Sequence, residues 1–560
     1  MKLSILLIST ISATLLFAPL ECSAADDKVI VGYYVPWGKV EPEQLSLDKV
    51  THINYGFGVL TKKTADPTEI TIDRYYDGNR IRKLKQLAGA KGVKTLISLG
   101  GWTGSQTFST VVRDAALRKK FINNALVFVR KNTKPDYDAN PDGWDLDGID
   151  IDWEYPGRNA AICNVVDKSD SANYLILLKE LRAALDAEFP NEHKLLTAAV
   201  RVQPFDGADG KPMADVSAFA QYFDFINVMA YDIMGSWSAT TGPNAPFDYD
   251  TAKGGEAYSF RQSITDWLGA KWPANKLVMG LPFYGRSLTA TVDMNANPGN
   301  MYASKDSVTP KGDSNDSNEP NFFCNEGTFY SGIWKWKSIR SDILQSGVNT
   351  PASGWSRYWD NTTQTPWLFR ASDKRFISYD DPQSLKIKVD YTKQSGLRGV
   401  MYWDMSHDSN DELLSVLQGV RCTGSGCPQP TNTPAPTITT TATSNTVKPT
   451  STVPSTSSSG SATSGSPSPT SGPGICNGVA DWNAATAYNS AQKAVYKSHL
   501  WQAKWWTQND TPGSNSQNLH FAAFHTYIDI ATEFQPLVYQ AYSIARNDPD
   551  YFTYYDYPSS

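Results

Sequence analysis

Eight short apolar runs recur along the first 405 residues, and they constrain the fold of this chain more than any other feature. Segments with helical periodicity lie between most of them, such as residues 114–132 and 171–189. Nearly continuous apolar strands that alternate with amphipathic helices are typical of a parallel sheet covered by helices. Eight such repeats predict an α/β fold, a (β/α)8 TIM barrel over residues 26–428. The runs are KVIVGYYVPW (28–37), KVTHINYGFGVL (49–60), KTLISLGGW (94–102), GIDIDWEY (148–155), HKLLTAAV (193–200), FDFINVMAYD (223–232), KLVMGLPFYGR (276–286) and LRGVMYWDM (397–405).

The remaining residues divide by length and composition. Residues 288–375 are too long for a plain connection between a strand and a helix, so we expect an α+β insertion subdomain beside the barrel mouth. Residues 429–474 are almost entirely Pro, Thr, Ser, Gly and Ala, which cannot bury a core. They predict an extended linker that separates the barrel from a small C-terminal region.

The N-terminal sequence MKLSILLISTISATLLFAPLECSAADD has the pattern of a secretory signal peptide. Lys2 is followed by an apolar run that is short for a membrane-spanning helix, and then by small residues. We therefore expect residues 1–24 to be removed and the mature chain to be secreted and extracellular. No other stretch is apolar and long enough to span a bilayer, so no membrane partner is expected.

Charge and metal-ligand residues exclude several classes of function. The net charge of −6 provides no basic surface for nucleic acid. The six His and six Cys show no zinc-like spacing, so we expect no metal site. Secretion permits disulfides, and Cys422 and Cys427 could close a small loop. Buried aromatics account for many of the 17 Trp and 28 Tyr, but a surplus also fits surfaces that stack on sugar rings.

The segment DGIDIDWEYPG, residues 147–157, interleaves acidic and large apolar side chains. Side chains alternate along a strand, so Asp150, Asp152 and Glu154 share one face and the apolar residues share the other. In a barrel the apolar face packs under the helices, and the acids point inward. A solvated edge strand would not need so apolar an opposite face, and the oxygen-ligand spacing of an EF-hand calcium loop is absent.

Crowded carboxyls in a barrel interior raise at least one pKa, because like charges repel and burial disfavours ionisation. Glu154 lies nearest the C-terminal end of the strand, where barrel enzymes place their active sites. A carboxyl that stays protonated near neutral pH can act as a general acid, which cleavage of a glycosidic bond requires. The segment therefore indicates a general acid, with Glu154 as the candidate.

The same segment carries a family resemblance. DGIDIDWE resembles the DxxDxDxE signature of family 18 glycoside hydrolases, the chitinases. Four further segments resemble family motifs and occur in the family's order. They are SLGGW (98–102), MAYD (229–232), GLPFYGRS (280–287) and GVMYWDMSHD (399–408). The resemblance covers most of residues 28–420 and implies that residues 288–375 are the family's chitin-insertion subdomain.

The resemblance also implies a retaining, substrate-assisted mechanism without metal or cofactor. Glu154 would protonate the glycosidic oxygen, and the acetamido carbonyl of the sugar would attack its own anomeric carbon. Asp152 would accept the acetamido N–H, and Asp150 would support Asp152 by sharing its proton. Tyr231 would contact the acetamido group. Asp147 is expected to have a structural role at the start of the strand.

Further substrate contacts are implied by motif matches and by aromatic side chains beyond strand ends. Trp403 would form a floor beneath the distorted sugar. Trp102 and Trp237 could stack on product-side sugars, although packing of their loops is a competing interpretation. The full set of expected contacts is Asp232, Met229, Trp403, Tyr284, Arg286, Trp102, Trp237, Tyr33 and Phe57.

The C-terminal region carries a second resemblance. Residues 479–514, with the segment AKWWTQ, are similar to carbohydrate-binding modules of family 5/12, which implies a small β-rich chitin-binding module at 475–520. The tail at 521–560 departs from that pattern, since it contains no Trp, and could hold a helix around 525–546. The expected stacking residues are Trp482, Tyr488, Trp505 and Trp506.

Together these patterns predict a secreted, monomeric chitinase that hydrolyses β-1,4 bonds between N-acetylglucosamine units of chitin or chitin oligosaccharides. One alternative is an endo-β-N-acetylglucosaminidase that acts on glycoprotein glycans, because such enzymes share the acidic motif. Another is a non-catalytic chitin-binding lectin. The presence of Glu154 argues against the lectin, because members of that kind usually lose the acid.

Overall fold

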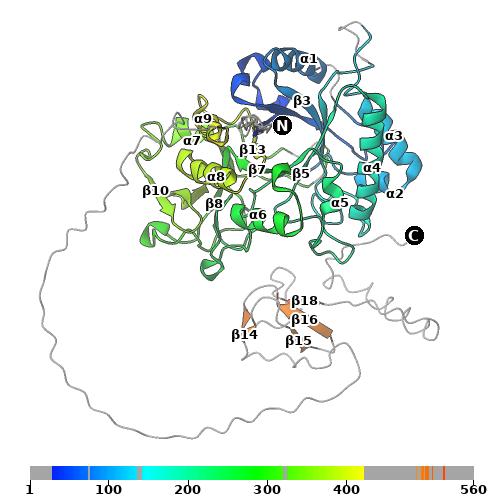
Figure 1. Ribbon diagram of the computed structural model, residues 1–560. Coiled ribbons are helices and arrows are strands. Elements are labelled where there is room, and N and C mark those ends of the chain that lie inside the picture. The colour runs from blue at the N-terminus through cyan, green and yellow to red at the C-terminus, as the bar shows by residue number, and fades with distance from the viewer. Residues whose placement is uncertain are drawn as a thin grey trace, which may run out of the picture. The chain divides into compact units, whose positions relative to one another are not determined.

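The computed structural model describes residues 28–72, 76–134, 142–319, 323–324 and 326–421, and the backbone of five short strands between 487 and 523. The predicted signal peptide and the predicted linker lie outside these residues. Figure 1 shows the chain coloured from blue to red along the sequence.

Eight parallel strands close into a barrel in the order β1-β13-β7-β6-β5-β4-β3-β2. Each predicted apolar run contains one of them, so the predicted barrel is confirmed. The strands are β1 (Val29–Tyr34), β2 (His52–Gly58), β3 (Lys94–Gly100), β4 (Gly148–Asp152), β5 (Leu195–Val200), β6 (Phe225–Val228), β7 (Leu277–Pro282) and β13 (Gly399–Trp403).

Helices surround the barrel in Figure 1 and bury its outer face. Trp153, just beyond β4, packs 5.3 Å from Phe108 and 5.3 Å from Tyr174 between ring centroids. This confirms that the apolar face of the acidic segment lies under helices. The helices are α1 (Tyr76–Gly89), α2 (Phe108–Arg113), α3 (Ala115–Leu126), α4 (Asp170–Glu188), α5 (Ser217–Ala220), α6 (Phe260–Gly269), α7 (Trp336–Asp342), α8 (Pro382–Gln394) and α9 (Glu412–Leu417).

Short connections carry 3-10 helices. They are η1 (Pro36–Gly38), η2 (Pro42–Gln44), η3 (Leu47–Lys49), η4 (Thr251–Lys253), η5 (Ala274–Lys276), η6 (Met294–Ala296) and η7 (Gln418–Val420). Within the described ranges, no helix combines the length and the apolar character needed to cross a bilayer.

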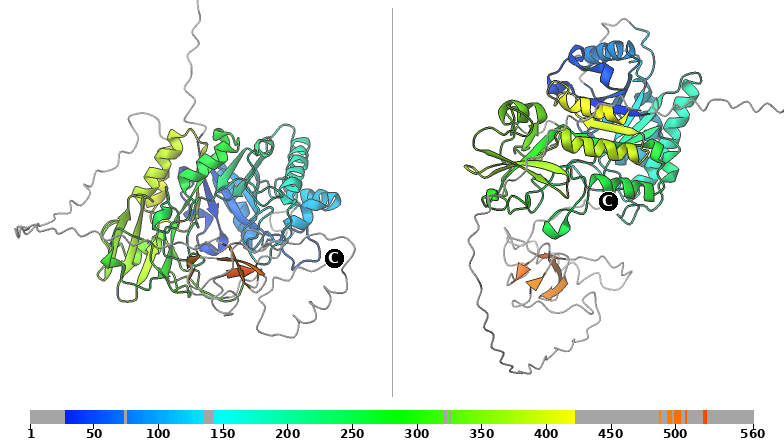
Figure 2. Two further views of the ribbon diagram at one scale, coloured as in Figure 1. Left: turned by 90° about the horizontal axis from the view of Figure 1, so that it is seen from below. Right: turned by 60° about the vertical axis from the view of Figure 1, so that its left-hand side comes forward.

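A second, antiparallel sheet lies beside the barrel, as Figure 2 shows. The run at 276–286, predicted as a single strand, is two strands, because the chain leaves the barrel after Pro282 and then pairs with the second sheet. The sheet order is β10-β11-β12-β8-β9. Its strands are β8 (Tyr284–Thr289), β9 (Ile333–Lys335), β10 (Trp355–Asp360), β11 (Thr365–Arg370) and β12 (Arg375–Ser378). The predicted subdomain bounds of 288–375 stay a prediction.

The five C-terminal strands form two small antiparallel sheets. Tyr488 belongs to β14, but its side chain lies outside the described residues, as do Trp482, Trp505 and Trp506. The predicted stacking surface therefore stays a prediction. One sheet pairs β14 (Ala487–Tyr488) with β17 (Thr507–Gln508), and the other joins β15 (Lys493–Tyr496), β16 (His499–Ala503) and β18 (Phe521–Ala523).

Candidate active site

The three acids of the predicted site sit at the C-terminal end of β4 and point into the barrel. Asp150 is fully buried, Asp152 is 3% exposed and Glu154 is 9% exposed. The register places Asp150 between Ser98 on β3 and Thr197 on β5. Parallel pairing thus brings hydroxyl side chains from both neighbouring strands to the innermost acid.

Asp150 is held by four hydrogen-bond donors. Its Oδ2 accepts from the hydroxyls of Tyr33 and Ser98, both at 2.8 Å. Its Oδ1 accepts from the Thr197 hydroxyl at 2.6 Å and from the Asn227 amide at 3.5 Å. Burial raises the pKa of Asp150 above its ordinary value, and these four donors oppose that rise by stabilising the carboxylate. Both oxygens of Asp150 are therefore fixed in place.

Asp152 differs from Asp150 in its hydrogen bonding. Among the described residues, no donor contacts its buried Oδ1. Burial, followed by the negative charges of Glu154 and Asp150, raises its pKa well above the ordinary value. Because a buried oxygen without a partner is costly, Oδ1 is a ready acceptor for a donor that a bound substrate brings.

Glu154 has the pKa of a general acid. Burial raises its pKa to about 7, a hydrogen bond with Tyr155 opposes the rise, and the charge of Asp232 adds to it. Its backbone is anchored on both sides: its N–H donates to the Ser105 hydroxyl at 3.2 Å, and its carbonyl accepts from the Asn164 amide at 2.9 Å. At neutral pH a large share of this carboxyl, about half, is therefore protonated at the barrel mouth.

Residues beyond β6 and on β8 form a second part of the site. Asp232 Oδ1 accepts from the Tyr284 hydroxyl at 2.6 Å and from Arg286 Nε at 2.7 Å. Asp232 adopts a left-handed backbone conformation with φ 57°, which Asp tolerates better than most residues. The Tyr231 ring lies edge-on to Tyr284, with centroids 6.1 Å apart. Half-buried Met229 precedes this group, so the structure brings five of the predicted residues together.

Aromatic side chains from β13, β2 and β1 lie together at the mouth. Trp403 stacks on Phe57 with centroids 5.8 Å apart and planes at 14°. Tyr33 also lies against Trp403, but it is only 1% exposed and its hydroxyl is bonded to Asp150. The structure therefore places the Tyr33 hydroxyl on Asp150, and the expected sugar contact of Tyr33 stays a prediction. Trp37, which the sequence analysis did not identify, is exposed and lies 6.1 Å from Phe57.

The two predicted product-side tryptophans remain accessible. Trp102, beyond β3, is 46% exposed, and Trp237, beyond β6, is 57% exposed. The Trp102 indole N–H donates to Glu326 at 3.2 Å. The Arg286 guanidinium lies 4.9 Å from the centroid of the Trp237 ring. Each ring is oriented by one polar neighbour, and neither is buried in its loop.

Some residues that position the acids were missed, although the sequence holds a signal for them. Ser98, Thr197 and Asn227 are polar residues inside largely apolar strands, and all three contact Asp150. A buried polar side chain needs a partner, so such an isolated residue points to a buried acid nearby. Within the described ranges, no group of three or more His, Cys, Asp or Glu side chains is arranged to hold a metal ion.

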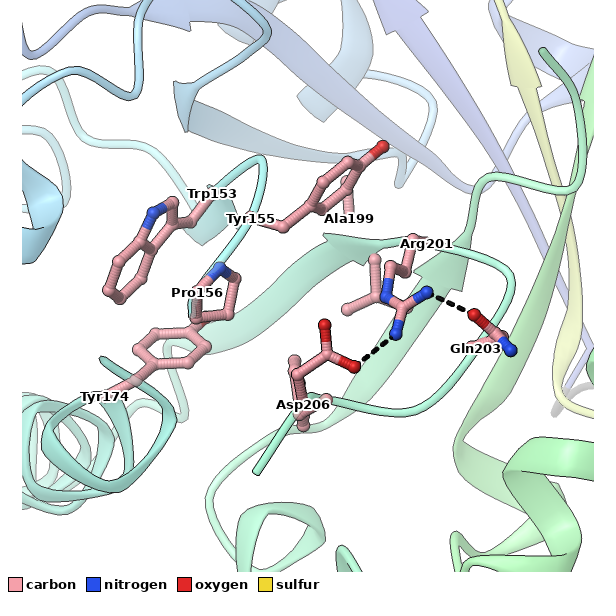
Figure 3. A pocket seen from close by; sticks show the side chains of 10 residues that line it. Trp153, Tyr155, Pro156, Tyr174, Ala199, Arg201, Gln203 and Asp206 are labelled. Atoms are coloured by element: carbon pink, nitrogen blue, oxygen red, sulfur yellow. Dashed lines mark hydrogen bonds and ion pairs between the residues drawn. The ribbon is translucent and has the colours of Figure 1, made fainter. Parts of the chain in front are cut away.

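A small pocket lies behind β4, next to Tyr155, the residue that follows Glu154. Figure 3 shows Arg201 between Asp206 and Gln203, and the Tyr155 hydroxyl directed away from them. Arg158 Nε also donates to the buried Asp206 carboxylate at 2.7 Å. These ion pairs fix the turn after β5 against Tyr155. The lining residues are Trp153, Tyr155, Pro156, Tyr174, Ala199, Val200, Arg201, Gln203, Phe205 and Asp206.

Asp147, at the start of the acidic segment, lies at the opposite end of the strand from Glu154. Its Oδ2 accepts from Lys85 Nζ at 2.7 Å and from the Thr95 N–H at 2.9 Å. Burial alone would raise the pKa of Asp147, but the Lys85 ammonium and the Thr95 amide hold it below its ordinary value. The contacts agree with the expected structural role.

Replacing Asp147 with Ala is expected to lower the free energy of unfolding by about 1–3 kcal/mol without changing turnover, because Lys85 and Thr95 lose a buried acceptor. The Asp147 carboxylate stabilises the fold at pH values above its ordinary pKa of 3.8. This stabilisation is lost as the pH falls, because the pKa of Asp147 is lower in the folded state. Urea unfolding at several pH values measures it. Glu43→Ala, which breaks an exposed pair with Lys83, is the matched control and should have almost no effect.

The comparisons with known proteins agree with this geometry. The model of Glycosyl hydrolases family 18 matches residues 29–408. A chitinase-like effector from Moniliophthora roreri is 32% identical over 424 residues, which cover 74% of this chain and 96% of that protein.

Solved structures of chitinases are also similar to this chain. A chitinase from Rhizomucor miehei has 33% sequence identity and a TM-score of 0.62, and the match covers 70% of this chain and 100% of that one. A Class V chitinase from Nicotiana tobaccum in complex with NAG4 has 25% identity and a TM-score of 0.56, covering 71% of this chain and 99% of that one. The chain therefore belongs to glycosyl hydrolase family 18, as an enzyme of the chitinase type.

Proposed function

We propose that this enzyme hydrolyses β-1,4 bonds between N-acetylglucosamine units of chitin by a retaining, substrate-assisted mechanism. One observation carries the proposal: a buried Glu154 with a pKa of about 7 lies next to Asp152, whose Oδ1 has no donor among the described residues. The first group can supply a proton, and the second can accept the N–H of an acetamido group. The names of the chitinase relatives support the same substrate.

In the first step the Glu154 carboxyl gives its proton to the glycosidic oxygen, and the bond between that oxygen and the anomeric carbon breaks. The leaving sugar keeps the electron pair. The acetamido carbonyl oxygen of the remaining sugar forms a bond to the anomeric carbon, which gives an oxazolinium ion. Asp152 Oδ1 accepts the acetamido N–H and stabilises the positive charge that develops.

In the second step the Glu154 carboxylate removes a proton from water, and the water oxygen attacks the anomeric carbon. The bond to the acetamido oxygen breaks, so Glu154 and the acetamido group return to their starting states. Two successive inversions at one carbon give net retention. Asp150, fixed by its four donors, positions Asp152 from behind. The proposed sharing of a proton between these two carboxyls rests on the raised pKa values of both.

The surrounding residues take supporting roles in this proposal. Tyr231 and Asp232 hold the acetamido group from the loop after β6, and Tyr284 and Arg286 orient Asp232. Trp403 supports the sugar from below. Secretion through residues 1–24, a monomeric state and chitin binding by residues 475–520 belong to the same proposal. The Cys163–Cys324 disulfide supports secretion, because disulfides persist in oxidising compartments.

The substrate is tested by assaying the purified enzyme on soluble chitin oligosaccharides and on a high-mannose glycopeptide. We expect hydrolysis of the oligosaccharides, with the β-anomer as the first product seen by proton NMR. Cleavage of the glycopeptide alone would assign the endo-β-N-acetylglucosaminidase activity instead. Initial formation of the α-anomer would contradict the retaining mechanism.

A binding role is the second candidate, because one relative is named a chitinase-like effector. A chitin-binding protein without turnover would bind the same oligosaccharides and leave them intact. The Glu154 and Asp152 side chains and their raised pKa values favour the enzyme. The oligosaccharide assay separates the two candidates directly.

The pKa of Glu154 also predicts the alkaline side of the pH profile. Glu154 must be protonated to act as the acid, so kcat/KM should fall as the pH rises through about 7. Far above the pKa the loss approaches about tenfold per pH unit, since the protonated fraction falls by that factor. Initial rates on a chitin oligosaccharide, measured in buffers of constant ionic strength, check this. An activity that is still constant two units above that pKa would contradict the assignment.

A further inference from the structure

The second sheet has two edge strands, β9 and β10, and the two edges differ. β9 is three residues long and ends in Lys335. Its outer side is covered by a preceding segment of the chain: the Asp313 N–H donates to the Ile333 carbonyl at 2.9 Å, and the Asp313 carboxylate accepts from the Lys335 N–H at 3.2 Å. A short, charged and covered edge strand gives a second chain little to pair with.

β10, at the outer side of the sheet in Figure 1, is a longer edge strand. Its six residues are WSRYWD, and within the described part of the chain it pairs with β11 alone. It contains neither Lys nor Pro, which edge strands commonly use to prevent pairing with another chain. Arg357 donates to the buried Asp381 at 2.6 Å, and Asp360 is itself buried, so neither charge guards this edge.

A sequon for N-linked glycosylation follows β10 directly. Asn361-Thr362-Thr363 has the pattern N-x-T, which marks an acceptor asparagine on the surface of secreted chains. These residues lie in the turn of the hairpin between β10 and β11. Asn361 is exposed, whereas Thr363 is fully buried. The structure thus presents the acceptor asparagine to solvent at the end of the open edge.

The hydrogen bonds of this turn hold Asn361 outward. Asp360 Oδ1 accepts from the N–H groups of Thr362 at 3.0 Å and Thr363 at 2.7 Å. The Thr363 carbonyl accepts from the Phe247 N–H at 2.8 Å, which ties the turn to the loop after β6. The turn is therefore fixed by its inward groups, and the side-chain amide of Asn361 takes no part in these bonds.

A second sequon, Asn315-Asp316-Ser317, lies in the connection between β8 and β9. Asn315 is also exposed, and its N–H donates to Asp313 at 2.9 Å. Because Asp313 is the residue that covers β9, this sequon lies beside the covered edge. The chain thus offers two exposed acceptors of the same kind, one at each edge of the sheet.

We propose that Asn361 carries an N-linked glycan that screens the open edge of β10. This inference rests on the proposed secretion, which the Cys163–Cys324 disulfide also supports, and adds a modification to it. The co-reactant is a lipid-linked oligosaccharide pyrophosphate of a eukaryotic secretory compartment. The Asn361 side-chain nitrogen bonds to the anomeric carbon of this donor and loses a proton to solvent. The bond from that carbon to the phosphate oxygen breaks, and the lipid pyrophosphate leaves with the electron pair.

The fold determines both the timing and the effect of this modification. Thr363 is buried in the folded hairpin, so the transfer takes place on the unfolded chain, and the exposed Asn361 then leaves room for the glycan. An N-linked glycan is bulky and solubilising. At the end of β10 it prevents a second copy of the chain from laying its own edge strand alongside.

The first test measures occupancy on the full chain, expressed in a glycosylating eukaryotic host with its own residues 1–24 as the leader. Trypsin releases residues 358–370, in which Asn361 is the only asparagine. We expect this peptide from the secreted protein to carry a glycan, and peptide N-glycosidase to convert Asn361 to Asp, as seen by mass spectrometry. A secreted chain with this peptide unmodified overturns the inference alone. A chain that stays inside the cell overturns the proposed secretion, and the inference with it.

The second test measures the screening. Asn361→Gln should raise the fraction that aggregates just below the melting temperature by about twofold or more, because the edge of β10 is then open. Asn315→Gln, beside the covered edge, is the matched control and should aggregate as the wild type does. An unchanged fraction in Asn361→Gln, or an equal rise in both variants, overturns the screening of the edge. Removing the glycan from the folded wild type with the glycosidase repeats the comparison without a mutation, and rates on a chitin tetrasaccharide should be equal in all samples.

Discussion

Glu154→Gln is expected to lower kcat on chitin oligosaccharides by about 10²–10⁴-fold while oligosaccharide binding survives. Gln has nearly the same shape as protonated Glu and keeps the buried packing at the end of β4, but its amide cannot give up a proton to a glycosidic oxygen. Steady-state rates and calorimetric titration with a chitin tetrasaccharide separate the two effects. Binding energy is preserved because the side chain acts mainly on the transition state.

The matched control is Glu69→Gln, an exposed residue outside the site. It should hydrolyse the oligosaccharide as the wild type does. Wild-type turnover by Glu154→Gln would remove the acid role from this residue. Loss of both turnover and binding in a folded variant would mean that Glu154 holds the ground-state substrate, which the proposed mechanism does not require.

Asp152→Asn should lower kcat by about 10²–10³-fold, because a neutral amide cannot stabilise the positive oxazolinium ion as a carboxylate does. The same change is expected to raise the melting temperature at neutral pH. The pKa of Asp152 is raised well above its ordinary value by burial and by Glu154 and Asp150, so its ionisation opposes folding. This cost is absent below the ordinary pKa of 3.8 and grows as the pH rises.

Measuring kcat and the melting temperature on one sample tests both parts of this prediction. Asp150→Asn is the informative comparison, because four donors already compensate Asp150 and its amide would meet three hydroxyl groups and one amide donor. We expect no gain in melting temperature there. A loss of stability in Asp152→Asn would show that Asp152 supports the fold, and that its pKa is not raised by burial.

Local sequence patterns predicted the barrel because each strand carries its own signal. Runs such as TLISLG and LLTAAV are apolar on both faces, as strands covered by helices and core must be. Alternation in the acidic segment also predicted which side chains point inward, and the structure confirms the outward packing of Trp153.

Features that depend on pairing between distant segments were not predictable in this way. The Cys163–Cys324 bond joins residues 161 apart, and nothing near either cysteine specifies its partner. The loop suggested for Cys422 and Cys427 lies outside the described residues. The bond from Tyr33 to Asp150 likewise depends on barrel closure, which brings inward-facing side chains of the non-adjacent strands β1 and β4 together in the interior.

The continuous passage from β7 into β8 has a consequence for protein engineering. Tyr284 and Arg286, which hold Asp232, lie two and four residues after Pro282, where the barrel strand ends. A miniaturised enzyme could have its outermost strand β10 trimmed, but not β11, whose Trp367, Leu368 and Phe369 are buried, and not β8, since that strand supplies the side chains that hold Asp232. The practical boundary for truncation therefore runs through the second sheet and not along its junction with the barrel.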